Sequence, residues 1–189
     1  MTVRDPQTGP ETLVRIPTVL TARLALRAPK PADFDAFADF RAGTRAYFVG
    51  GPYTRAQAFG QFCGLVGHWH LRGFGRWIIA DRQSDAALGT VGPFFPEGWL
   101  EPEIAWTVFD GHEGKGIAFE AAEAARVFAY DTLGWTTAVS LVARENTRSN
   151  ALAQRLGATR EGVFQHAEIG TLDVWRHPSP AQLRATGVA

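Results

Sequence analysis

The sequence predicts a single α+β domain in which helices pack on a mostly antiparallel, twisted central sheet. Three runs of strand length follow one another in the middle of the chain, and apolar residues at helical spacing follow a glycine-rich loop. The 189 residues suffice for one real core, and neither a repeat nor a linker divides them. We expect the domain, with about four helices, over residues 19–178, between loose tails at 1–18 and 179–189.

The N-terminal part predicts one strand and two helices. Apolar and arginine residues alternate over residues 24–28, which indicates a strand. Pro31 starts a short Phe-rich helix whose first turn carries acidic residues, where the helix dipole favours them. Thr54 and Gln57 form a capping-box pattern for a longer helix, and Gly73 is placed to end it.

Strands dominate the middle of the chain, at 76–81, 87–95 and 103–109. Pro93 and Pro96 are expected to push the end of the second run toward a sheet edge or a loop, because proline has no backbone N–H to donate. The C-terminal part then predicts a helix over 118–133, a buried strand over 137–143, a helix over 149–156 and a hairpin from 162–164 and 172–175.

Composition limits the classes of partner. The formal net charge is +0, which argues against nucleic acid or an anionic membrane surface. Cys63 is the only cysteine, so no intramolecular disulfide forms and a reducing compartment is expected. No apolar run reaches the length of a membrane span, and residues 1–12 lack the apolar core of a signal peptide. We therefore expect a cytoplasmic protein, monomeric or homodimeric, without a metal site.

The loop before the long C-terminal helix carries the strongest functional signal. Gly111, Gly114 and Gly116 surround Lys115 and lead directly into the helix. Glycines allow backbone N–H groups to converge, and the helix dipole adds partial positive charge, which suits a phosphate or pyrophosphate. An ordinary helix-capping turn is the alternative. No hydroxyl follows Lys115, as a Walker A loop requires, and Phe119 occupies the third glycine position of a dinucleotide fingerprint.

The spacing from Glu113 to Ala118, after a strand-like run, resembles the pyrophosphate-binding signature Arg/Gln-x-x-Gly-x-Gly/Ala of the GCN5-related N-acetyltransferase (GNAT) superfamily. Glu113 departs from it, so its carboxylate is expected to point outward or to weaken the site. Residues 146–157, with Asn-x-x-Ser before a helix that ends in Leu-Gly, and residues 165–168 resemble the branch of ribosomal-protein serine and alanine N-terminal acetyltransferases. The resemblance spans roughly residues 20–177.

This resemblance implies acetyl-CoA as cosubstrate and a primary amine, either a protein N-terminus or a small metabolite, as acceptor. The loop N–H groups are expected to hold the pyrophosphate, and the preceding strand is expected to pair with the pantetheine arm. The expected cofactor-binding residues are Thr107, Val108, Gly114, Lys115, Gly116, Ile117, Ala118 and Asn146. A non-catalytic acyl-CoA-binding protein of the same fold is the alternative function.

An amine attacks a thioester only when neutral, so a base must remove its proton, and the departing thiolate benefits from a hydrogen-bond donor. The resemblance to this branch implies that Glu168 is the general base and that Ser149 is the hydrogen-bond donor to the thiolate. Because the hairpin after Glu168 is short, Glu103 is a second candidate base. A solvated hairpin carboxylate, a helix-start hydroxyl and an edge-strand charge are the respective alternatives. Ala153 stands where many relatives carry a tyrosine acid, so that route is absent.

Other residue types receive less weight. We expect direct attack by the amine in a ternary complex, because Cys63 matches no nucleophile signature. Aromatic residues in and after the strands are more often core than pocket, so only a minority are expected to line the acceptor site. These aromatic residues are Phe94, Phe95, Trp99 and Trp106.

Overall fold

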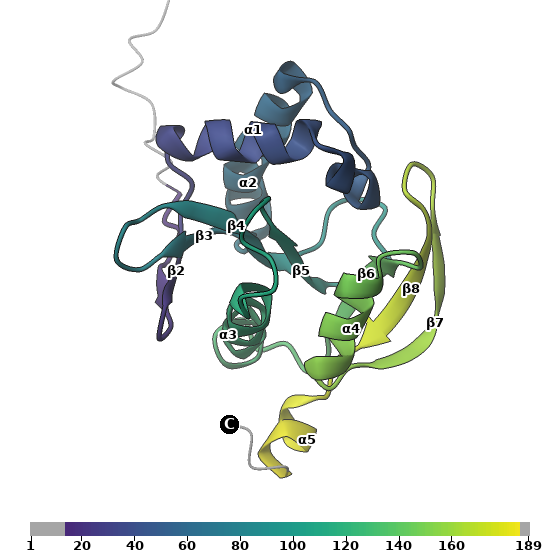
Figure 1. Cartoon of the computed structure of the whole chain (residues 1–189). Coiled ribbons are helices and arrows are strands. Elements are labelled where there is room, and N and C mark those ends of the chain that lie inside the picture. The colour runs from purple at the N-terminus through teal and green to yellow at the C-terminus, as the bar shows by residue number, and fades with distance from the viewer. Residues whose placement is uncertain (1–13, 186–189) are drawn as a thin grey trace, which may run out of the picture.

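The computed structural model describes residues 14–185, which form one eight-stranded sheet flanked by helices (Figure 1). The strand order is β1-β2-β3-β4-β5-β6-β8-β7, and every neighbouring pair is antiparallel except β5 and β6. The strands are β1 (Val19–Leu20), β2 (Leu24–Arg27), β3 (Trp77–Asp81), β4 (Ala87–Phe94), β5 (Glu103–Val108), β6 (Val139–Ala143), β7 (Thr159–His166) and β8 (Gly170–Arg176). The helices are η1 (Pro31–Asp33), α1 (Phe34–Ala42), η2 (Thr44–Val49), α2 (Arg55–Arg72), α3 (Ile117–Asp131), α4 (Thr147–Arg155) and α5 (Pro180–Ala185).

The α+β prediction is confirmed, and most of the predicted elements are present with shifts of a few residues. The Thr54–Gln57 capping box starts α2, and Gly73 ends it in a left-handed conformation. The two-residue strand β1 was not predicted. The short helix α5 lies where a C-terminal tail is expected, and residues 1–13 of the expected N-terminal tail lie outside the described residues.

The prediction that Pro93 lies toward an edge or loop holds on one side only. Strand β4 lies between β3 and β5, but its pairing with β3 ends at Val91, while Pro93 still pairs with Ile104 of β5. At Gly92 a Cβ would lie 2.5 Å from the carbonyl oxygen of Gly75. Only glycine allows the backbone at residue 92 to lie this close to the backbone at Gly75. This close approach occurs where the pairing between β3 and β4 ends.

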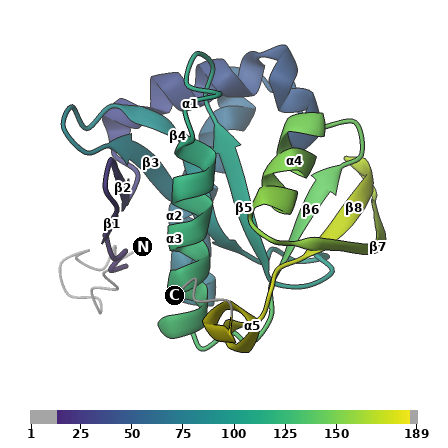
Figure 2. The same ribbon diagram turned by 60° about the horizontal axis from the view of Figure 1, so that its bottom comes forward.

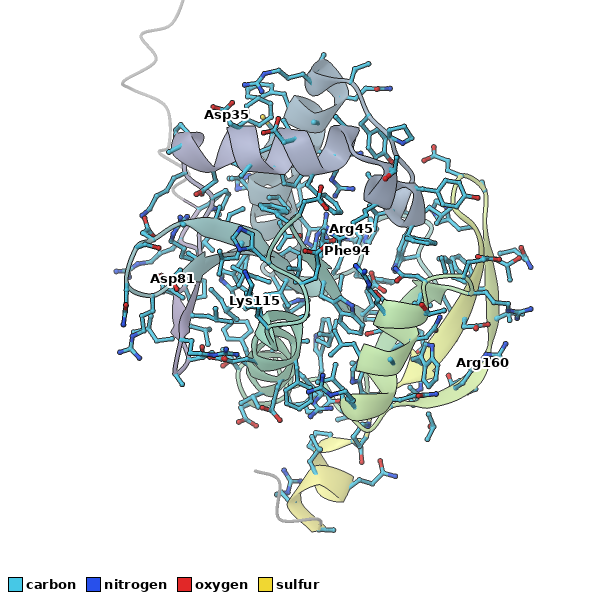
Figure 3. All side chains as sticks on the ribbon, in the orientation of Figure 1. Asp35, Arg45, Asp81, Phe94, Lys115 and Arg160 are labelled. Atoms are coloured by element: carbon cyan, nitrogen blue, oxygen red, sulfur yellow. The ribbon has the colours of Figure 1, made fainter. Side chains whose placement is uncertain are left out.

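Helices α3 and α4 lie on one face of the sheet, and α1 and α2 lie on the other (Figure 2). The side of α3 that faces the sheet is rich in alanine, and the absence of long side chains lets the helix approach the strands closely. Side chains fill the space between the layers, whereas Asp35 and Arg160 lie at the periphery (Figure 3). Fully buried members of the two main core clusters include Leu26, Trp77, Val91, Ile104, Ala121, Ala125, Ile78 and Ala58.

Strands β5 and β6 diverge soon after they meet (Figure 2). Their parallel pairing has a single register position, Glu103 with Val139. Each strand leads into a helix, β5 into α3 and β6 into α4. The separation of the two strands therefore opens the sheet between the starts of these two helices.

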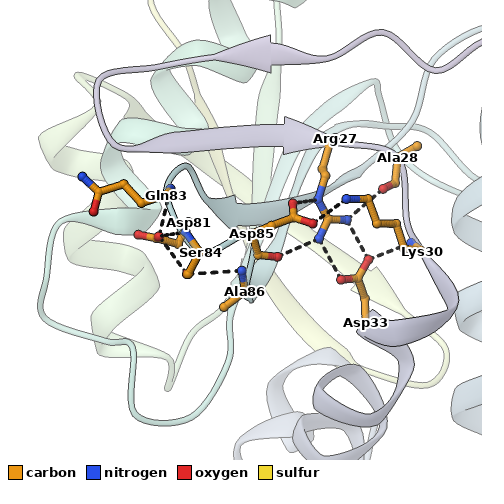
Figure 4. A network of polar contacts seen from close by, with 9 residues as sticks. All are labelled: Arg27, Ala28, Lys30, Asp33, Asp81, Gln83, Ser84, Asp85 and Ala86. Carbon is orange, nitrogen blue, oxygen red and sulfur yellow. Dashed lines mark hydrogen bonds and ion pairs between the residues drawn. The ribbon is translucent and has the colours of Figure 1, made fainter.

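An ion-pair network with a buried pair at its centre fixes the N-terminal elements to the β3–β4 turn (Figure 4). The Arg27 guanidinium is almost fully buried and donates to both carboxylate oxygens of Asp33, at 2.7 and 2.9 Å. Arg27 and Lys30 also pair with Asp85 in the turn. Asp33, expected only as a first-turn helix residue, thus neutralises a buried charge, and the loss of one partner of such a pair costs about 3–5 kcal/mol.

Candidate active site

The glycine loop leads directly into α3, and the backbone N–H groups at this junction form no hydrogen bonds within the helix. Gly114 and Gly116 have φ of +74° and +76°, a conformation that favours glycine, and Gly116 is the N-cap residue of α3. The first N–H groups of a helix have no partner within it. Arg23 donates to the Lys115 carbonyl at 3.0 Å and forms an ion pair with Glu120 at 2.7 Å. Arg23 thereby fixes the loop from outside, while the first N–H groups of α3 have no partner within the helix.

Lys115 was expected to bind the cofactor and Glu113 was expected to point away from the site or to weaken it, but the structure places both side chains differently. The Lys115 ammonium donates to the Gly111 carbonyl at 2.7 Å, and its side chain is not part of the cleft described below. Glu113 does line the cleft, where it pairs with Arg45 at 2.7 Å and Arg148 at 3.6 Å. Its own backbone N–H and these guanidinium groups lower the pKa of Glu113. Its negative charge is therefore balanced by two arginines rather than turned outward.

A cleft of about 790 Å³ lies between β5, the start of α3 and the start of α4. Apart from Lys115, every residue expected to bind the cofactor lines it. These are Thr107, Val108, Gly114, Gly116, Ile117, Ala118 and Asn146.

The start of α4 places a free hydroxyl in this cleft. The Asn146 side chain accepts a hydrogen bond of 3.2 Å from the Ser149 backbone N–H, so Asn146 caps the helix. The Ser149 hydroxyl is not needed as the cap; it instead accepts a bond of 3.3 Å from the Trp106 indole N–H. The position of a cleft-facing hydroxyl is therefore fixed from two sides.

A second cavity of about 440 Å³ adjoins the cleft. Of the aromatic residues proposed for an acceptor pocket, Phe94, Trp99 and Trp106 line it, whereas Phe95 does not and packs under the Arg72 guanidinium. The residues common to both spaces are Phe48, Val49, Trp106, Thr107, Asn146 and Ser149. The cleft and the cavity therefore meet beside the Ser149 hydroxyl.

Glu103 is a carboxyl group of this cavity whose pKa is strongly shifted. It is 4% exposed at the start of β5. Burial raises its pKa to about 7, although the Leu141 N–H, which donates at 2.9 Å, and the charge of Arg76 both act in the opposite direction. A carboxyl group with a pKa near neutrality exchanges its proton readily under physiological conditions.

Glu168 lines the same cavity but lies at its surface. It occupies the turn between β7 and β8, is exposed, and its backbone N–H donates to the His166 Nδ1 at 3.2 Å. The two candidate bases thus share one cavity, Glu103 inside it and Glu168 at its edge. Cys63 is exposed on α2 and lines neither space.

Sequence reasoning missed two arginines of the cavity, Arg41 from α1 and Arg76 from the residue before β3. An arginine in the last turn of a Phe-rich helix and another beside a strand both suggest surface positions. Only the packing of α1 and α2 on the sheet brings them inside, so no local pattern reveals them.

The family profile Acetyltransf_3, described as an acetyltransferase (GNAT) domain, matches residues 23–159. An acetyltransferase from Agrobacterium tumefaciens is 38% identical, with a TM-score of 0.80, over 90% of this chain and 100% of that one. A putative GNAT-family acetyltransferase from Bordetella pertussis is 28% identical, with a TM-score of 0.71, over 86% and 100%. The uncharacterized N-acetyltransferase YoaA of Bacillus subtilis is 26% identical over 153 residues, 79% of this chain and 86% of that protein.

The site therefore combines diverging strands, a glycine loop at a helix start and two adjoining cavities. The chain belongs to the GNAT acetyltransferase family and is an N-acetyltransferase. Enzymes of this family use acetyl-CoA. A ribosomal L7/L12 α-N-protein acetyltransferase seen with coenzyme A shares the fold, at 17% identity and a TM-score of 0.69 over 85% of this chain and 97% of that one. Within residues 14–185 no helix is long and apolar enough to cross a membrane.

Proposed function

We propose that this enzyme binds acetyl-CoA in the cleft and transfers the acetyl group to a primary amine held in the adjoining cavity. The observation that carries the proposal is the meeting of the two spaces at Ser149, with the buried Glu103 carboxyl group on the acceptor side. One space then serves the donor and the other serves the acceptor, as direct transfer in a ternary complex requires.

The residues at the cleft fit a CoA pyrophosphate. The positive φ angles of Gly114 and Gly116 direct the loop so that the unpaired N–H groups of α3 remain available. Arg45 and Arg148 lie beside the loop, where they balance the charge of Glu113, and Arg45 also pairs with Asp110 at 2.7 Å. When bound, acetyl-CoA supplies the activated acetyl thioester.

Glu103 is the stronger candidate for the general base. Its pKa of about 7 leaves it largely ionised at slightly alkaline pH yet basic enough to take a proton from an ammonium or amine group. The Leu141 N–H holds one carboxylate oxygen, which fixes the orientation of the group. Glu168 remains the second candidate, because it lines the same cavity from its edge.

Ser149 offers the hydrogen-bond donor for the leaving sulfur. Its Oγ accepts from Trp106, so its own proton is free to point into the space shared by both sites. A donor already oriented before reaction stabilises developing negative charge at little reorganisation cost.

A thiol-release assay with acetyl-CoA and a panel of primary amines tests the proposed function. We expect turnover with at least one amine and initial-rate plots that intersect as both substrates are varied. Tight CoA binding without turnover for any amine would contradict the proposal and favour a non-catalytic acyl-CoA-binding protein. Parallel plots together with acetyl label on the protein would contradict direct attack.

A further inference from the structure

The acceptor cavity contains two guanidinium groups without an anionic partner. Among the described residues, neither Arg41 nor Arg76 forms an ion pair, although most other arginines do. Arg41 is 4% exposed and its Nε atom is buried with no hydrogen-bond partner. The Nε of Arg76 is also buried and unpartnered. Buried polar groups of this kind are normally satisfied, so both require an explanation.

Their known contacts do not balance the charge. The Arg41 guanidinium lies 5.0 Å from the Phe37 ring centroid and donates one long bond, 3.5 Å, to the Val49 carbonyl. The Arg76 guanidinium lies 4.2 Å from the ring centroid of Phe94, the residue that is labelled near the middle of the view in Figure 3. Cation–π contacts offset part of the desolvation cost but leave the N–H donors unpaired.

The electrostatics of the two groups agree with this view. Burial lowers the pKa of Arg41 to about 10, and burial together with the charge of Arg41 lowers the pKa of Arg76 to about 10. Glu103 acts on Arg76 in the opposite direction, but it supplies at most one negative charge against two positive ones. The other carboxylate of the cavity, Glu168, lies at its exposed edge, so the inner part holds two guanidinium groups and a single carboxyl group.

We propose that the acceptor is a small amine that also carries a carboxylate, with its amino group at Glu103 and its carboxylate bound by Arg41 and Arg76. This inference rests on the proposed function and specifies its substrate class. Guanidinium forks match the planar geometry of a carboxylate, and such charge-assisted bonds are strong in a desolvated site. The zwitterion supplies the anion that the two arginines lack and the ammonium that Glu103 deprotonates.

The dimensions of the cavity favour a free amino acid over a peptide N-terminus. A volume of about 440 Å³ lies at the small end of the range for small-molecule sites. Ile169, in the β7–β8 turn, reaches toward Gly50, with its Cγ1 3.8 Å from where a Cβ of Gly50 would lie. Ile169 lines the cavity, so the β7–β8 turn forms part of its wall on the side of η2.

The test measures kcat/KM for acetylation of α- and ω-amino acids of increasing length, each beside its own carboxamide, and of a peptide with an acidic second residue. We expect at least one free amino acid to exceed its amide about 10–100-fold, from one charge-assisted interaction of roughly 1.5–3 kcal/mol. Arg76→Gln should reduce this acid-to-amide ratio at least tenfold, and Arg76→Lys should restore part of it. Arg41→Gln, if it folds, should act in the same direction.

Arg55→Gln is the matched control, because it removes one arginine charge from an exposed pair with Asp35 at the outer side of α1 (Figure 3). It should leave the acid-to-amide ratio unchanged. Equal rates for acids and amides, or a preference for the acidic peptide over every free amino acid, would overturn the inference while the proposed function stands. If no amine is acetylated, the proposed function fails; calorimetry with the free acids and amides then tests the arginine site alone, and equal binding would overturn it.

Discussion

The Glu103 carboxylate accepts a hydrogen bond of 2.9 Å from the backbone N–H of Leu141, across the point where β5 and β6 separate. A side-chain oxygen thus takes the place that a strand carbonyl would hold in a regular sheet. One residue earlier, the Ser140 hydroxyl takes the place of a strand N–H, because it donates to the Ile104 carbonyl at 2.6 Å. The strands diverge without unpaired buried groups at these positions, and the same contact fixes the candidate base in the opening.

Glu103→Gln should lower the acetyl-transfer rate by about 10²–10⁴, because the amide keeps the shape and the bond to Leu141 but removes the basicity. The affinity for CoA should hardly change, since Glu103 lies outside the cleft. Steady-state rates and CoA calorimetry on the two single variants Glu103→Gln and Glu168→Gln decide between the candidates. A collapse in Glu168→Gln with near-normal rates in Glu103→Gln would assign the base to the hairpin turn instead.

The value of kcat/KM should rise between about pH 6 and pH 8, with a midpoint near the Glu103 pKa of about 7. Only the ionised carboxylate accepts a proton, so activity is present above this pKa and lost below it. Arg76 lowers the pKa of Glu103, so Arg76→Gln should move the midpoint to higher pH. A pH–rate profile of each protein measures both effects. An unmoved midpoint in Arg76→Gln would show that another group controls this limb.

Gly116→Trp should block CoA binding, because a Cβ at residue 116 would lie 3.3 Å from the Arg23 guanidinium, and a bulky side chain there would displace the arginine that holds the loop. Residue 116 also has φ of +76°, so any side chain adds strain of about 1–2 kcal/mol. Gly134→Trp is the control for that strain, since Gly134 follows the other end of α3 with φ of +71° and open space around its Cβ position. Calorimetry with CoA should separate the two variants. Equal affinities in both would place the cofactor elsewhere.

The backbone elements were predictable because their signals are local. The Thr54–Gln57 capping box is present with the bond from the Thr54 N–H to the Gln57 side chain at 2.9 Å, and the spacing of apolar residues located α3. The residues of the glycine loop and the two candidate bases were also identified from the sequence. Each signal lies within a few positions along the chain.

The electrostatic state of the acceptor cavity was not predictable, because it depends on elements far apart in the sequence. Arg41 comes from α1, Arg76 precedes β3 and Glu103 starts β5, and each pattern alone is typical of the surface. Likewise, that Asn146 rather than Ser149 caps α4 follows from the geometry of the β6–α4 junction, where either side chain type is a common cap.

Ser149→Ala should lower kcat more than it raises KM for acetyl-CoA, because a bond to the leaving sulfur strengthens as negative charge develops there. The loss should be smaller than that of Glu103→Gln, since a thiolate leaves readily near neutral pH. The helix cap is retained, because Asn146 bonds to the backbone of residue 149. Trp106→Phe removes the partner of the Ser149 hydroxyl and controls for its orientation. An increase in KM alone would indicate a role in binding only.

The last prediction concerns acid stability and His177, which is 2% exposed behind the diverging strands. Its Nε2 lies 2.9 Å from the Ser140 hydroxyl, and its Nδ1 lies 3.5 Å from an Arg126 guanidinium nitrogen. Burial, and then the charges of Arg126 and Arg176, lower its pKa to about 3. Between about pH 6.5 and 3 the unfolded chain therefore binds a proton that the folded protein excludes, so stability falls as the pH drops. At pH 5 this loss is about 2 kcal/mol for the 1.5 pH units below the ordinary value.

His177→Gln should remove this loss, because glutamine offers an N–H to Ser140 and does not titrate. Urea unfolding at pH 7 and pH 5 measures it: the parent protein should lose about 2 kcal/mol more than the variant between the two conditions. His70→Gln, at an exposed position on α2, is the matched control and should behave like the parent. Equal losses in the parent and His177→Gln would show that His177 takes up its proton in the folded state, and that the Ser140 contact behind the acceptor cavity tolerates a charged imidazole.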